Sequence, residues 1–141
     1  MRFMIIVKGS PESEAGVMPA PEVFEAMGKF NEDLINAGVL LAAEGLHPSS
    51  KGARVTSEAG NLVVRDGPFG EAKELLAGFW IISAKSQDEA LEWVKRIPFD
   101  DGETIELRRV FEAADFAEVV PEEAVAKEQA WRDATQQPIT N

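Results

Sequence analysis

The hydrophobic residues along the chain predict four β-strands. Residues 3–8 and 76–83 are hydrophobic at nearly every position, so each strand would be hydrophobic on both faces, as is typical of strands inside a sheet. Residues 39–46 have the pattern of another strand, and residues 104–111 alternate between two faces as the last one. The chain therefore contains enough strand to build one four-stranded sheet.

Two segments have hydrophobic residues at helical spacing. The first begins at Pro21, a favourable first helical residue because it lacks the N–H that would be unpaired there, and it ends at Gly38. The second begins with a capping box between Ser86 and Glu89 and ends before Pro98. Each helix would bury one stripe: Val23, Phe24, Met27, Phe30, Leu34 and Ile35 in the first, and Ala90, Leu91, Val94 and Ile97 in the second.

A β-hairpin is predicted between the strands at 39–46 and 76–83. Its two arms are residues 53–57 and 61–66, on either side of the turn Glu58-Ala59-Gly60. Because side chains alternate along a strand, one face of the second arm carries Leu62, Val64 and Asp66.

The remaining segments are less regular. Residues 10–21, with three prolines and one glycine, are predicted as a loop, and residues 70–74 as a short helical turn. Pro121 would open a weakly amphipathic last helix, and the polar residues after Thr135 are expected to be mobile. The hydrophobic anchors available to this last helix are Ala124, Val125 and Trp131.

This order of elements favours an α+β fold: an antiparallel sheet with two helices on one face and an inserted hairpin. Such a sheet leaves its other face bare. We expect a hydrophobic patch on that face, formed by one set of alternating residues: Met4, Ile6, Trp80 and Ile82, or else their neighbours. A patch of this kind seldom stays in water, so the sequence predicts a homodimer with two sheets packed face to face.

Composition and charge narrow the function classes. The chain has 141 residues, of which 45% are hydrophobic and 28% charged, the balance of one ordinary globular domain. It has no cysteine and one histidine, which leaves neither a thiol nucleophile nor an ordinary set of zinc ligands. Its net charge of -11 disfavours direct binding to nucleic acid or to anionic lipid. We therefore expect a cytoplasmic protein that uses no metal or cofactor and crosses no membrane.

Several motifs occur in an order that is similar to one known family. Asp66-Gly67-Pro68-Phe69 resembles the signature of the YCII-related family in its DGPF-domain branch. The resemblance covers residues 1–112 and leaves residues 113–141 as a C-terminal helical extension and tail. The other motifs that carry it are Arg2-Phe3-Met4, Glu44-Gly45-Leu46-His47-Pro48, Gly78-Phe79-Trp80, Asp88-Glu89-Ala90-Leu91-Glu92-Trp93 and Ile105-Glu106-Leu107-Arg108.

The resemblance implies a ferredoxin-like dimeric α/β barrel. It implies less about activity, since most members have no assigned function. In one branch a His–Asp pair is suggested as an acid–base site, with its histidine on the first helix, and some relatives eliminate small groups from aromatic compounds. This chain has no histidine between Pro21 and Ala37, so that half of the pair cannot be carried over. Other members occur beside extracytoplasmic-function sigma factors.

His47 and Asp66 are the candidate catalytic residues. Histidine is the side chain that most readily exchanges protons near neutral pH, and His47 is the only one present. Asp66 would face the interior cleft and act as a base or orient one. The alternatives are structural: His47 could be a solvated loop residue, and Asp66 could accept hydrogen bonds from the following turn, as aspartate before glycine commonly does.

Glu44 and Arg109 are predicted to bind ligand, because each shares a strand face with hydrophobic residues. A charge at such a position needs a partner or a bound ion, and Arg109 could hold a carboxylate. The alternative is a structural ion pair between such groups. In both cases we expect the two side chains to be less exposed than their charge suggests.

Phe69 and Trp80 complete the predicted ligand-binding set. Aromatic rings can line a site for a flat hydrophobic molecule, although an aromatic residue in a strand more often belongs to the core. No phosphate-binding glycine loop, nucleophile elbow or nucleotide fingerprint occurs in the chain.

Two functions from different classes fit these observations. The first is a homodimer that binds a small anionic or aromatic molecule, with acid–base activity of the lyase or isomerase type if it is an enzyme. The second is a non-catalytic regulatory or interaction protein, associated with a sigma factor, for which the last helix would be the docking element. The alternative for this helix is a structural one, a tail that straps across the partner subunit. In the first reading His47 and Asp66 exchange protons while Arg109 holds an anionic group.

Overall fold

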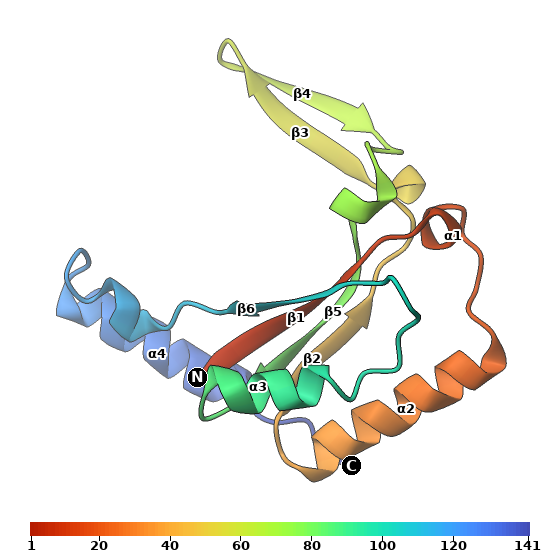
Figure 1. Cartoon of the computed structure of the whole chain (residues 1–141). Helices are drawn as coiled ribbons and strands as arrows, with labels where there is room; N and C mark the ends of the chain where they lie inside the picture. Colours follow the sequence, from red (N-terminus) through yellow and green to blue (C-terminus); the bar gives the residue numbers. More distant parts are fainter.

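The computed structural model describes residues 1–141, and its central element is a four-stranded antiparallel sheet (Figure 1). The strand order is β2-β5-β1-β6. The elements are β1 (Arg2–Lys8), α2 (Pro21–Asn36), β2 (Leu40–Gly45), β5 (Leu76–Ser83), α3 (Gln87–Val94) and β6 (Ile105–Arg109). In the chain, helix α2 connects β1 to β2 and helix α3 connects β5 to β6. With the hairpin set aside, this order βαββαβ is the ferredoxin-like arrangement, and it confirms the predicted α+β fold.

The two strands that are hydrophobic on both faces, β1 and β5, are the central strands, as predicted. They pair with each other in antiparallel register, with Ile5 opposite Trp80 and Phe3 opposite Ile82. Apart from Arg2 and Lys8 at the two ends of β1, the charged residues of the sheet lie on the edge strands β2 and β6. A central strand has no contact with water along its edges, so its hydrophobic pattern follows from its place in the sheet.

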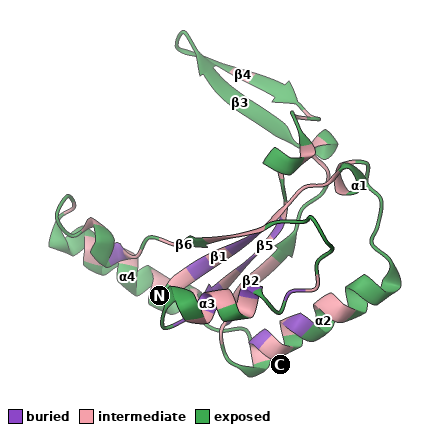
Figure 2. Ribbon diagram, in the orientation of Figure 1, coloured by how far each residue is buried: buried purple, intermediate pink, exposed green.

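Helices α2 and α3 lie on one face of the sheet and bury the core against it (Figures 1 and 2). Pro21 is the first residue of α2, and the hydroxyl of Ser86 accepts a hydrogen bond from the backbone N–H of Glu89 at the start of α3. Both predicted helix starts are thus confirmed. The core consists of Phe3, Ile5, Phe30, Leu34, Leu40, Trp80, Ile82, Ala84, Ala90, Val94 and Ile97.

The other face of the sheet carries no helix, as Figure 1 shows. Met4 lies opposite Ile81, and Ile6 lies opposite Phe79, so these four residues form the centre of the bare face. The expectation that Met4 and Ile6 share a face with Trp80 and Ile82 is wrong, because the register pairs those two residues with Ile5 and Phe3 on the helix side. On β5 the residues next to them, Phe79 and Ile81, lie on the bare face instead.

The segment predicted as a loop before α2 contains one helical turn, α1 (Pro11–Glu14). Its start is held by a reciprocal pair of hydrogen bonds between Ser10 and Ser13. The predicted turn after the hairpin is a short 3-10 helix, η2 (Ala72–Glu74), and another, η1 (Ser49–Lys51), precedes the hairpin.

The predicted hairpin is confirmed as β3 (Ala53–Glu58) and β4 (Asn61–Asp66). It forms a separate two-stranded sheet and projects from the body on the side of the bare face (Figure 1). The turn residues Ala59 and Gly60 both have positive φ angles, of 49° and 84°, which suits the right-handed twist of a two-residue hairpin turn.

The C-terminal part consists of the 3-10 helix η3 (Ala113–Phe116), helix α4 (Glu122–Thr135) and a tail. No residue of α4 is buried. In the tail, the N–H of Ile139 donates to the carbonyl of Leu40 at 2.8 Å, at the start of β2. None of the helices is long and hydrophobic enough to span a bilayer.

Candidate functional site

The candidate site lies where the hairpin joins the body, and we call it the hairpin root: residues 47–54, residues 66–69 and Glu14. Two close backbone contacts shape it. The N–H of Gly67 donates to the carbonyl of Gly52 at 3.0 Å, and a Cβ atom on Gly67 would lie 1.8 Å from the carbonyl oxygen of Ser49. Only glycine fits there, so the Asp-Gly-Pro-Phe motif is first of all a device for close backbone packing.

Ser49 forms hydrogen bonds to two other segments of the hairpin root. Its backbone N–H and its hydroxyl both donate to the carboxylate of Glu14, at 3.0 Å and 2.5 Å. The same hydroxyl oxygen accepts from the N–H of Phe69 at 3.0 Å. These bonds tie α1, η1 and the motif together, and hydrogen bonds to a charged carboxylate are stronger than those between neutral groups.

Arg54 covers the ring of Phe69. Its guanidinium carbon lies 4.1 Å from the ring centroid, a cation–π contact. The residue directly opposite in the hairpin is Arg65, and that side chain forms an ion pair with Glu58 at 2.8 Å, whereas Arg54 takes part in no ion pair. Arg54 therefore presents its N–H groups to solvent from a fixed aromatic support.

Both candidate catalytic residues belong to the hairpin root, and both are exposed. Asp66 ends β4 opposite Ala53, on a hairpin that stands away from the body, so it does not face an interior cleft as predicted. Its alternative role as acceptor for the next turn is also wrong, because the hydroxyl of Ser49 takes the N–H of Phe69. His47 lies two residues before Ser49, in the segment between β2 and η1.

The structure separates Glu44 from Arg109. Glu44 lies on β2 opposite Phe79, on the bare face, whereas Arg109 lies on β6 opposite Phe3, on the helix side. Because β2 and β6 are the two edges of the sheet, an ion pair between these residues is excluded. Both side chains are exposed, which corrects the expectation that they would be shielded.

Arg109 also lies far from His47 within one protomer. Arg109 pairs with Phe3, near the start of β1, whereas the end of β2 that leads to His47 lies beside Val7 through Gly78. The four residue steps from Phe3 to Val7 span about 13 Å of strand. One small ligand cannot touch both groups, so the arrangement in which Arg109 serves the same ligand as His47 is not formed in a single chain.

Arg109 instead borders a small hollow of about 160 Å³ at the end of β6. The other lining residues are Val110, Phe111 and Asp115. The carboxylate of Asp115 accepts the N–H of Glu112 at 2.7 Å, so it is already engaged. The hollow is small beside the volume of about 300 Å³ or more that is usual for ligand pockets.

The two predicted aromatic ligand-binding residues have different places. Phe69 belongs to the hairpin root, under Arg54. Trp80 is 7% exposed and lies in the core, where its ring stands edge-on to Phe30 and its indole N–H donates to Asn31 at 2.7 Å. This is the core position that the sequence analysis gave as the alternative for Trp80.

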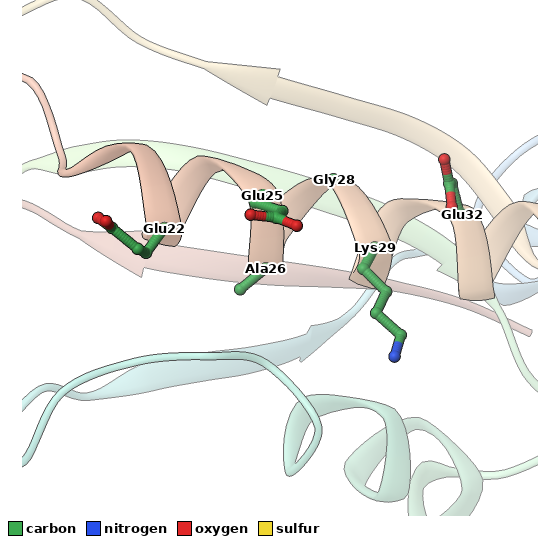
Figure 3. Close-up of a pocket in the computed structure, with 6 residues that line it drawn as sticks. All are labelled: Glu22, Glu25, Ala26, Gly28, Lys29 and Glu32. Atoms are coloured by element: carbon green, nitrogen blue, oxygen red, sulfur yellow. The ribbon is translucent and has the colours of Figure 1, made fainter.

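A larger hollow follows the exposed side of α2 (Figure 3). It is an open acidic groove that contains none of the predicted site residues. Lys29 is its only basic side chain, and Figure 3 shows Lys29 and Ala26 pointing away from the helix on the same side. The lining residues are Glu22, Glu25, Ala26, Gly28, Lys29 and Glu32. No three His, Asp or Glu side chains of the protein gather closely enough to hold a metal ion.

Sequence reasoning missed three residues of the hairpin root: Glu14, Ser49 and Arg54. Glu14 and Ser49 are 35 positions apart, and no local pattern links them. Arg54 did carry a signal, because it is one of only three basic residues between positions 30 and 70.

Comparisons with known proteins found a matching domain family, a similar protein sequence and a similar solved structure. The model of the YCII-related domain matches residues 1–114. An uncharacterized protein of Rhizobium meliloti (strain 1021) is 41% identical over 73 residues, which are 52% of this chain and 59% of that protein. The match thus spans less than two thirds of that relative.

Among solved structures, the chain is similar to 5-chloro-2-hydroxyhydroquinone dehydrochlorinase from Burkholderia phenoliruptrix AC1100, in complex with 2,5-dihydroxybenzoquinone. The TM-score is 0.41 at 22% sequence identity, over 79% of this chain and 95% of that one. Because the domain model covers well over half of the chain, from β1 to η3, the protein belongs to the family with a YCII-related domain.

Proposed function

We propose that this protein is a homodimer that binds a small, anion-bearing planar molecule at the hairpin root, with acid–base activity of the lyase or isomerase type. The observation that carries the proposal is the stacking of Arg54 on Phe69. A guanidinium held flat on a ring keeps its N–H edge free, and that edge matches a carboxylate with two parallel hydrogen bonds. In a chain with a net charge of -11, an arginine without an acidic partner stands out.

The neighbouring polar groups suit proton transfer to such a ligand. His47 and Asp66 both lie in the hairpin root and both are exposed in a single protomer. Asp66 ends β4 at the root, on the hairpin face opposite to Arg54. An elimination needs a base that removes a proton from the substrate while the leaving group departs with its bonding electrons. We assign the base role to His47, because histidine changes its charge near neutral pH, and we assign Asp66 to orienting it or the substrate.

The dimer part of the proposal rests on the bare face. Its centre is Met4, Ile6, Phe79 and Ile81, and its edges carry Glu44 on one side and the Glu106–Arg108 pair on the other. A hydrophobic centre with a charged rim is the usual composition of a protein interface. We also place the dimer in the cytoplasm, where a cysteine-free chain of this size needs no disulfide.

The test is a thermal-shift screen with small carboxylates and hydroxylated aromatic acids, repeated on variants. Arg54→Ala should weaken binding of any hit about tenfold or more, since a charge-assisted hydrogen bond is lost. Arg65→Ala is the matched control, because Arg65 lies directly opposite but is engaged by Glu58. His47→Gln should preserve binding and abolish turnover. Ligands whose binding is unchanged in Arg54→Ala but lost in Arg109→Ala would indicate that the binding site is the hollow at the end of β6.

Helix α4 favours a second candidate function, that of a regulatory or interaction protein with a sigma factor as its partner. The helix buries no residue, and Trp131 is 59% exposed. Tryptophan is enriched at the centres of protein interfaces. A screen without hits, together with loss of sigma-factor binding in Trp131→Ala, would support this second candidate over the first.

A further inference from the structure

The β3–β4 hairpin is amphipathic although nothing lies beneath it. Its register places Val55 opposite Val64, with Leu62 on the same face. These three side chains are 62%, 63% and 76% exposed, respectively. The opposite face is mostly polar and charged: Arg54, Thr56, Glu58, Asn61, Val63 and Arg65. A strand pair with one hydrophobic face has the pattern of an element that is covered on that face.

No part of the same chain provides that cover. The hairpin is a sheet of its own, and Figure 2 shows it exposed along nearly its whole length. A two-stranded hairpin alone in water is marginally stable at best. Any cover for its aliphatic face would therefore have to come from outside the protomer.

The direction of the hairpin is held by its root. Ser49 is bonded to Glu14 and to Phe69, and Gly67 packs directly on the backbone of Ser49. Arg54, in the second residue pair of the hairpin counted from its root, stacks on Phe69. These contacts fix the orientation of the hairpin relative to the body, as is expected for an arm that contacts another molecule.

We propose that the hairpin of each copy packs its aliphatic face, Val55, Leu62 and Val64, against the second copy of the dimer. This inference rests on the homodimer of the proposed function. The hairpin projects on the side of the bare face, so a copy seated on that face meets it (Figure 1). Six residues per strand give an arm of about 20 Å, whereas packed sheets lie about 10 Å apart. The arm is therefore long enough to pass the edge of the partner's sheet.

The charge of the arm does not oppose contact with a second copy. Residues 53–66 contain two basic and two acidic side chains, whereas the rest of the chain contains 12 basic and 23 acidic side chains. Two bodies of such net charge repel each other, but the neutral arm adds nothing to that repulsion. The same holds for both copies, because a twofold dimer exchanges both arms.

The absence of cysteine from the chain provides a clean test. Leu62→Cys places one thiol on the aliphatic face of the arm, and Thr56→Cys places one on the polar face as the matched control. The rate of modification by N-ethylmaleimide is measured at protein concentrations below and above dimerisation, which sedimentation of the same variants determines. We expect the Leu62→Cys thiol to react about tenfold more slowly in the dimer, and the Thr56→Cys thiol to be unaffected. Val55→Cys, on the other strand of the same face, should repeat the Leu62→Cys result.

The possible outcomes distinguish a failure of the proposed arm contact from a failure of the proposed homodimer. A dimer in which the Leu62→Cys and Val55→Cys thiols react at the monomer rate would overturn the arm contact and leave the homodimer standing. A chain that stays monomeric at every concentration would overturn both. Protection of the aliphatic-face thiols that follows the dimer population, with the Thr56→Cys thiol unprotected, supports the arm contact.

Discussion

At the scale of single residues, Gly67 shows how a short motif acts through backbone geometry. The motif around it resembles a family signature, and its Asp66 is a candidate catalytic residue. The structure gives the glycine the clearer role, because its missing side chain lets two segments touch. A contact between positions 49 and 67 has no periodic pattern, so the sequence could indicate the motif but not the residue on which its glycine packs.

Gly67→Ala should destabilise the fold by about 2 kcal/mol or more, because the new Cβ would press on backbone that cannot move aside. Thermal unfolding measures the change. The control is Gly28→Ala in α2, where a Cβ meets no atom within 4 Å, and which should be neutral or stabilising by up to about 1 kcal/mol. Equal effects of the two substitutions would contradict the close packing at Ser49.

At the scale of elements, the pattern of hydrophobic residues located nearly every helix and strand. The boundaries of β5 and the start of α2 agree with the prediction because proline, glycine and hydrophobic spacing act locally. The one-turn helix α1 was missed since its Ser10–Ser13 capping pair lies in a stretch dominated by loop-forming residues. Its purpose is also non-local: it presents Glu14 to Ser49.

Glu14→Ala should lower the free energy of unfolding by about 1–3 kcal/mol, because it leaves the N–H and hydroxyl of Ser49 without their acceptor. Chemical denaturation checks the value. Glu12→Ala, in the same helical turn and exposed, is the matched control and should change stability by less than about 0.5 kcal/mol. If the two variants unfold alike, the link between α1 and the hairpin root contributes nothing to stability.

At the scale of the whole molecule, the sequence predicted a bare hydrophobic sheet face but assigned two of its residues wrongly. Strands β1 and β5 are hydrophobic on both faces, so the alternation within β5 could not show which of its two sets of side chains faces the helices. The antiparallel register decides it, by pairing Ile5 with Trp80. The same limit applies to Arg109, whose distance from His47 depends on which strands are neighbours.

The most direct test of the account is sedimentation equilibrium of the intact chain across micromolar concentrations, alongside Ile81→Glu. Ile81 lies at the centre of the bare face, opposite Met4, so a carboxylate there would be buried in the interface without a partner. We expect the intact chain to sediment with twice the mass of one chain and Ile81→Glu to sediment as a folded monomer. A single-chain mass for the intact protein at every concentration would contradict the central claim that a second copy covers this face.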